Sequence, residues 1–171
     1  NTTFLFDDKL GQKYLFEAMN LPLVPTFVFY SKKEAREWAT GAEFPLVFKL
    51  RGGAGSRNVK LIKNRYQALR VINKAFGKGI RPYNALGGIK DSIRKYRKGK
   101  VVFKEVVKSI IHIIYPIQLE RSQSREKGYV YFQKFIPGCK YDIRVQLVGE
   151  RVWAMIRPIR EHDFRASGSG K

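Results

Sequence analysis

The sequence predicts an α+β protein with either one core or two small lobes around a cleft. Helix and strand patterns alternate through the first 72 residues, and two hairpin patterns occupy residues 44–63 and 141–159. The composition is that of a folded chain, with 44% hydrophobic and 13% aromatic residues. A length of 171 residues is sufficient for either arrangement.

The first part of the chain predicts two helices separated by a strand. Asp7 or Asp8 can cap a helix that runs to about residue 19. The β-rich segment 26–30 predicts a strand. Ser31 and Glu34 form a capping box, which predicts a second helix to about residue 40.

A hairpin and a third helix are expected next. The mostly apolar segment 44–50 and the segment 58–63 predict two strands, joined by the glycine-rich turn 51–57. Asn64 can cap a helix that reaches about residue 76. Further along the chain, 129–136 predicts a strand, and a second hairpin is expected from the strands 141–148 and 151–159.

The chain is strongly basic, with 34 Lys and Arg against 14 Asp and Glu and a formal net charge of +20. Such a charge attracts anions without choosing among them. The segment 73–128 is the most basic part, and within it 101–115 predicts an apolar helix with one polar stripe. This segment fits a solvated basic surface, an anionic membrane surface or an acidic polymer. Nucleic acid is the least favoured partner, because no RNA- or DNA-binding motif is present.

Lys49 is the first candidate for chemistry. It lies in an apolar strand, so it needs an anionic partner if its side chain points inward. In the glycine-rich turn 51–57, backbone N–H groups could converge on phosphate oxygens. The alternative is a hairpin with a loose basic tip. The turn matches neither a Walker motif nor a Rossmann turn, which joins a strand to a helix.

A second group of charged residues lies in the last hairpin and just after it. Asp142 and Arg144 are two residues apart in one strand, so they share a face and are expected to be neighbours. Three more arginines follow at the end of the hairpin, at Arg157, Arg160 and Arg165. Arginine binds phosphate and carboxylate bidentately, so this gathering predicts an anion site. Lys9, Lys49 and the arginines of the hairpin are expected to face one cavity.

The single cysteine, Cys139, excludes a disulfide within the chain. His112 and His162 lie far apart, and no metal-binding histidine spacing occurs. We therefore assign no residue of this chain to a metal.

The ordered set of these segments resembles the ATP-grasp superfamily, and within it the RimK-like carboxylate–amine ligases. The resemblance covers residues 7–72 and 129–171. Its segments are Asp8-Lys9, FPLVFKLRGGAGSRNV, YVYFQKFIPGCKYDIRVQLVGERVWAMIR and DFRASGSG. It implies an ATP-grasp fold, with two α+β lobes enclosing a nucleotide cleft. Residues 1–72 would form the lid lobe with the glycine-rich hairpin, 73–128 a basic, partly helical insertion, and 129–171 the hinge strand and the start of an incomplete C-terminal lobe.

The resemblance also implies roles for individual residues. Nucleotide binding falls to two lysines on the phosphates, a glycine-rich loop over them and a hinge strand beside adenine: Lys9, Lys49, Gly52, Gly53, Gly55, Ser56, Gln133, Lys134, Phe135 and Ile136. The catalytic residues would be the arginines Arg144, Arg157 and Arg165. The loop that meets the substrate would contain Asp163, Ser167, Gly168 and Ser169.

The implied activity is ATP-dependent joining of a carboxylate to an amine, or less readily a thiol, through an acyl phosphate. The implied cofactors are ATP and Mg2+, with the magnesium ligands expected beyond residue 171. The implied partners are the nucleotide, a carboxylate substrate and an amine acceptor. The expected location is the cytoplasm, with peripheral membrane contact through 73–128 as an alternative. Two rival interpretations are a basic nucleic-acid or anionic-surface binding module, and an ATP-grasp scaffold that binds nucleotide without turnover.

Overall fold

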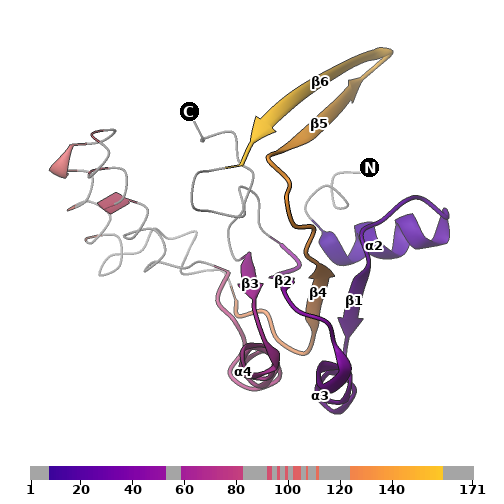
Figure 1. Ribbon diagram of the computed structural model, residues 1–171, viewed down its shortest axis with the longest axis vertical. Helices are drawn as coiled ribbons and strands as arrows, with labels where there is room; N and C mark the ends of the chain where they lie inside the picture. The colour runs from indigo at the N-terminus through magenta and orange to yellow at the C-terminus, as the bar shows by residue number, and fades with distance from the viewer. Residues whose placement is uncertain are drawn as a thin grey trace.

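The structure is a computed structural model that describes residues 8–52, 59–82 and 124–159, with single positions between 92 and 111. The predicted α+β class is confirmed (Figure 1). The helices and strands of the described residues are α2 Lys9–Ala18, β1 Thr26–Phe29, α3 Lys32–Gly41, β2 Leu46–Lys49, β3 Lys60–Ile62, α4 Arg65–Phe76, β4 Val130–Lys134, β5 Tyr141–Val148 and β6 Arg151–Pro158.

Each predicted helix cap is confirmed, because each capping side chain accepts hydrogen bonds from the first turn. Asp8 accepts from the N–H groups of Leu10 and Gly11, both at 3.0 Å. Ser31 accepts from the N–H of Glu34 at 3.4 Å, and Asn64 from that of Gln67 at 3.1 Å. These bonds satisfy N–H groups that have no partner within the helix.

We expect Asn64→Ala to lower the free energy of unfolding by about 1 kcal/mol, the usual cost of removing an N-cap side chain. Urea unfolding followed by circular dichroism measures this loss. Asn64→Asp is the matched control, because aspartate caps a helix as well as asparagine does. Equal losses in both variants would mean that the capping bond does not stabilise α4.

Four strands form an antiparallel sheet in the order β1-β4-β2-β3. The first predicted hairpin is confirmed, since β2 and β3 pair directly. The strand β4 lies between β1 and β2, with Phe132 paired to Phe27 on one side and to Phe48 on the other. The central strand of the sheet therefore comes from the part of the chain that follows the basic segment.

The core lies on one face of this sheet, against α3 and α4. Phe48, Phe132, Ile72 and Val130 are its largest fully buried side chains. Trp38 of α3 stacks on Phe132 at a centroid distance of 5.4 Å. Each helix contributes two fully or almost fully buried alanines to this core, namely Ala35, Ala39, Ala68 and Ala75.

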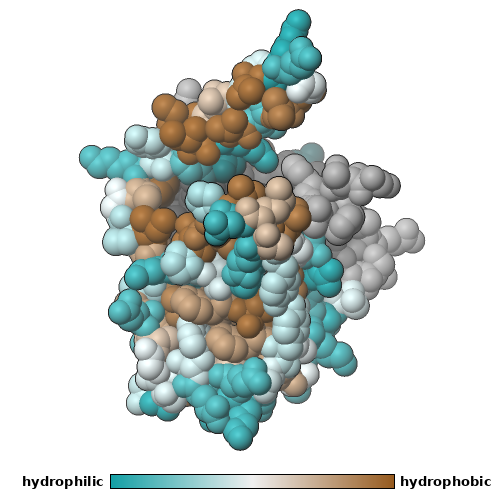
Figure 2. Space-filling model, turned by 90° about the vertical axis from the view of Figure 1, so that its right-hand side faces the viewer, coloured by the Kyte–Doolittle hydropathy of each residue, from teal (hydrophilic) through white to brown (hydrophobic). Residues whose placement is uncertain are grey.

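The strands β5 and β6 form the second predicted hairpin, which is confirmed as a separate two-stranded sheet. The hairpin extends away from the four-stranded sheet (Figure 1). One of its faces is entirely apolar, and brown side chains cover much of it in Figure 2. Most side chains of this face are more than half exposed, among them Tyr141, Ile143, Val145, Leu147, Val152 and Ile156.

Most of the basic segment lies outside the described residues. The described positions 103, 104, 107 and 111 are helical, within the range where the sequence predicts a helix. Across the described parts of the chain, every helix is too short or too polar to cross a lipid bilayer.

Candidate functional site

The face of the four-stranded sheet opposite the core carries polar side chains. Strand alternation places Thr26, Lys49, Tyr131 and Gln133 together on this face, because Lys49 pairs with Tyr131 and Gln133 pairs with Thr26. Burial raises the pKa of the Tyr131 phenol, and Glu17 of α2 is close enough to Tyr131 for its negative charge to raise this pKa further. The helix α2 therefore lies near this polar face of the sheet.

Lys49 begins a chain of hydrogen bonds that crosses three strands. Its Nζ donates to Gln133 Oε1 at 2.6 Å. Gln133 Nε2 donates to Thr26 Oγ1 at 3.1 Å, and the Thr26 hydroxyl donates to the Val24 carbonyl at 2.7 Å. Each donor has an acceptor, so the Gln133 amide is oriented with its oxygen toward the lysine.

The Lys49 ammonium is a half-buried cation beside a second cation. Burial lowers the pKa of Lys49, and the positive charge of Lys9 lowers this pKa further. Among the described residues, no carboxylate lies within ion-pair distance of Lys49; its partner is the neutral amide of Gln133. A buried charge of this kind is unfavourable unless an anion compensates it. The charges of Lys9 and Lys49 are therefore close enough to interact, and the contact of both lysines with nucleotide phosphates stays a prediction.

The root of the glycine-rich loop is fixed by several hydrogen bonds at Arg51. Its side chain donates to Asp8, its carbonyl accepts from the Lys9 N–H at 3.1 Å, and its own N–H donates to Glu126 at 3.0 Å and Tyr129 at 2.6 Å. Burial and a hydrogen bond to Glu126 raise the pKa of the Tyr129 phenol. Burial by itself would raise the pKa of Asp8, but hydrogen bonds from Arg51 and from helix amides outweigh it and lower this pKa.

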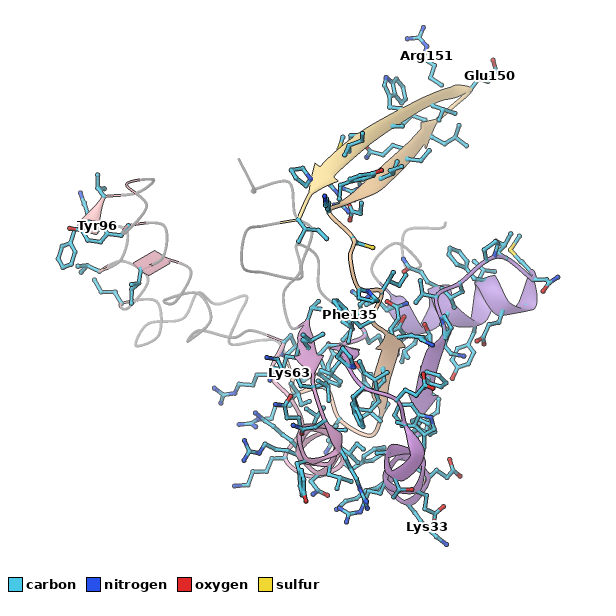
Figure 3. All side chains as sticks on the ribbon, viewed as in Figure 1. Lys33, Lys63, Tyr96, Phe135, Glu150 and Arg151 are labelled. Atoms are coloured by element: carbon cyan, nitrogen blue, oxygen red, sulfur yellow. The ribbon has the colours of Figure 1, made fainter. Side chains whose placement is uncertain are left out.

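The predicted hinge residues span the end of β4, because Gln133 and Lys134 are its last two residues and Phe135 and Ile136 follow it. The Lys134 N–H donates to the carbonyl of Pro25, just before β1, at 2.8 Å, so this N–H already has a hydrogen-bond acceptor within the protein. Phe135 is half-buried, and it lies where the chain leaves β4 toward the hairpin (Figure 3). Ile136 is 52% exposed. The adenine-binding role of this segment stays a prediction.

In the hairpin, the ion pair runs between strands rather than along one strand. Arg157 donates from Nε and Nη2 to the two oxygens of Asp142, at 2.7 and 2.6 Å. The register pairs Asp142 with Arg157 and pairs Arg144 with Met155. Asp142 and Arg144 share a face of β5, as expected, but the side chain that binds Asp142 is Arg157. Arg157 lies directly opposite Asp142, whereas Arg144 is displaced along the same strand.

Several predicted site residues lie outside the described residues, namely Gly53, Gly55, Ser56, Arg160, Asp163, Arg165, Ser167, Gly168 and Ser169. Gly52 is described and half-buried, with Glu126 Oε1 at 3.7 Å from the position of a built Cβ. The cavity expected to be shared by Lys9, Lys49 and the hairpin arginines stays a prediction.

Sequence reasoning missed four polar residues that support the site: Thr26, Arg51, Glu126 and Tyr129. The Arg51 backbone meets Glu126 and Tyr129 across more than 70 positions of sequence. No local pattern signals such a contact. Within the described parts of the chain, no group of three or more His, Cys, Asp or Glu is placed to hold a metal ion.

No protein-family model and no curated protein matches the chain. Among solved structures, a similar one is the crystal structure of D-alanine–D-alanine ligase from Helicobacter pylori, with 11% sequence identity and a TM-score of 0.38. The match covers 90% of this chain and 36% of that ligase, so the chain spans about a third of the ligase's length. A TM-score this low does not establish a common fold.

Proposed function

We propose that the chain binds ATP, with Lys9 and Lys49 on the phosphates, and that it is part of an ATP-grasp carboxylate–amine ligase of the RimK-like branch. The observation that carries the proposal is the uncompensated charge at Lys49. Its ammonium is half-buried, bonded to a neutral amide and close enough to Lys9 for the two charges to interact. Two cations held together on a polar sheet face fit a polyphosphate.

The proposed reaction has two steps. A carboxylate oxygen of the substrate attacks the γ-phosphorus, the bond to the β-phosphate oxygen breaks, and ADP leaves. The nitrogen of an amine then attacks the acyl carbon, inorganic phosphate leaves with the bonding electrons, and the amine loses a proton to give the amide. Alignment and charge neutralisation are the tasks of the protein in such a transfer, and the lysines and arginines would contribute to both at the phosphates.

In this proposal Arg157 acts near the γ-phosphate and Asp142 orients it. Two N–H donors of the guanidinium bind Asp142, and three of its five remain for an anion. The hydrogen bonds to Asp142 raise the pKa of Arg157, so the side chain stays charged. Mg2+ stays the second cofactor of the proposed reaction; among the described residues, no group of three or more His, Cys, Asp or Glu is placed to hold it.

A specific observation favours a second candidate, binding to an anionic polymer. Residues 59–82 contain no Asp or Glu, and β3, α4 and the turn after it expose Lys60, Lys63, Arg65, Arg70, Lys74, Lys78 and Arg81. Burial and the charge of Lys74 lower the pKa of Lys60, so the charges of Lys60 and Lys74 are close enough to interact. Nitrogen-tipped side chains project from α4 and its surroundings in Figure 3.

Calorimetric titrations at 50 and 200 mM salt separate the two candidates. A complex with six to ten phosphate contacts on a polymer is expected to lose about 10³–10⁵ in affinity over this range. We expect ATP to bind and to lose far less, because a short polyphosphate displaces few counterions. Heparin is the probe for the second candidate. An absence of ATP binding, together with steeply salt-dependent heparin binding, would contradict the ligase proposal and favour the polymer.

A further inference from the structure

Asp8 serves two parts of the structure with its two carboxylate oxygens. Oδ1 caps α2 by accepting from the N–H groups of Leu10 and Gly11. Oδ2 accepts two hydrogen bonds from the Arg51 guanidinium, from Nε at 2.9 Å and from Nη2 at 2.5 Å. The Asp8 side chain is only 13% exposed, so this charge-assisted contact is shielded from water on the carboxylate side.

The same two segments are also joined through their backbones. The Lys9 N–H donates to the Arg51 carbonyl at 3.1 Å. Lys9 is the first residue of α2, and Lys49 precedes Arg51 by two positions at the end of β2. Fastening Asp8 to Arg51 therefore fixes where Lys9 stands relative to Lys49.

We propose that the Asp8–Arg51 ion pair is a positioning device that holds Lys9 beside Lys49 before any anion binds. Two like charges repel each other, and they stay close only when other interactions fix their backbones. The identification of the anion as a nucleotide rests on the function proposed above, whereas the inference that the ion pair positions the two lysines does not. Asp8 and Arg51 are positioning residues. Because they bring the two lysines together when the protein folds, the free-energy cost of this approach does not reduce the affinity for the anion.

The pair can be broken without loss of the helix cap. In Asp8→Asn, the amide oxygen still caps α2, because asparagine and aspartate are equivalent N-caps. The amide NH2 cannot accept from Arg51, so the ion pair is lost. Arg51→Gln removes the other partner and leaves the cap untouched. The Arg51 side chain is 59% exposed, so its replacement is expected to leave the fold intact. Glu37→Gln is the control, since it removes the exposed Lys33–Glu37 pair on α3.

The readout is the pKa of the Lys49 ammonium, measured by NMR on full-length protein labelled with ¹⁵N-lysine and assigned with Lys49→Arg. If Lys9 moves away, the Lys49 pKa is expected to rise toward 10.5 in both Asp8→Asn and Arg51→Gln and to stay unchanged in Glu37→Gln. ATP affinity, measured by calorimetry, is expected to fall severalfold in the same two variants.

An unchanged Lys49 pKa in folded Asp8→Asn and Arg51→Gln would overturn the positioning role. A different outcome is that the wild-type protein does not bind ATP, although the Lys49 pKa still differs between the wild type and both variants. This result would overturn the proposed function and support the positioning device. If Asp8→Asn does not fold, Arg51→Gln alone decides the question.

Discussion

Lys49→Met is expected to weaken ATP binding by about ten- to a hundredfold, the equivalent of one charge-assisted hydrogen bond of about 1.5–3 kcal/mol. The lysine donates to Gln133 and stands beside Lys9 on the polar sheet face, so its loss removes a cation from the proposed phosphate site. Calorimetric titration with ATP measures the effect. Lys32→Met is the matched control, because Lys32 is exposed on α3, which packs against the opposite face of the sheet.

The same variant tests whether the Lys49 charge opposes folding. The pKa of Lys49 is lower in the folded protein than its ordinary value of 10.5, so the unfolded chain binds this proton more tightly. The charge therefore destabilises the fold at every pH below the folded pKa, and the penalty disappears as the pH rises to 10.5. Relative to Lys49→Met, the wild type is expected to gain stability across this window in urea unfolding. Unchanged ATP affinity and a flat stability difference would refute both roles of Lys49.

Phe132→Ala is expected to lower the free energy of unfolding by about 3–5 kcal/mol, the usual range for a buried phenylalanine. Phe132 is fully buried in the central strand, where its ring packs against Trp38 and Phe48. Truncation leaves a cavity between the sheet and α3 that these rigid rings cannot close. Urea unfolding monitored by far-ultraviolet circular dichroism measures the loss.

Two further variants make this stability test decisive. Phe132→Leu retains much of the apolar volume and is expected to lose less than Phe132→Ala, which keeps the comparison available if the alanine variant does not fold. Tyr66→Ala is the surface control, since Tyr66 is 83% exposed, and its loss is expected within about 0.5 kcal/mol. Similar losses at positions 66 and 132 would contradict the placement of Phe132 in the core.

The parts of the fold predicted from sequence are those fixed by neighbouring residues. Asp8, Ser31 and Asn64 cap their helices because a short side chain reaches N–H groups two or three positions ahead. Both hairpins join strands that are adjacent in the chain. The insertion of β4 between β1 and β2 was not predicted, because no local pattern states which distant strand fills a sheet.

For the candidate site, sequence reasoning identified the charged groups better than their partners. Lys49 was predicted to need an anionic partner, and the structure gives it the neutral Gln133 and a second lysine. Asp142 shares its face with Arg144, as expected, but the sequence analysis does not identify Arg157 as its cross-strand partner. The two-residue turn at Gly149 and Glu150 fixes the register, and counting outward from that turn identifies Arg157 as the partner. No local sequence pattern indicates that Asp8 also binds Arg51, because the two residues are distant in sequence.

The position of β4 has a consequence for how this protein is synthesised. Residues 8–82 contain β1, β2 and β3, but β1 and β2 flank the place of a strand that the ribosome makes about fifty residues later. In a nascent chain that has reached Arg81, the edges of β1 and β2 that later pair with β4 are exposed. Such a chain also lacks the Phe132 ring that packs against Trp38 and Phe48. The lysine pair can likewise settle only after Gln133 has emerged to receive Lys49. Cotranslational folding of this sheet can therefore be completed only after β4 has been synthesised. Until β4 is in place, the unpaired edges of β1 and β2 are accessible to chaperones or to other unpaired strands.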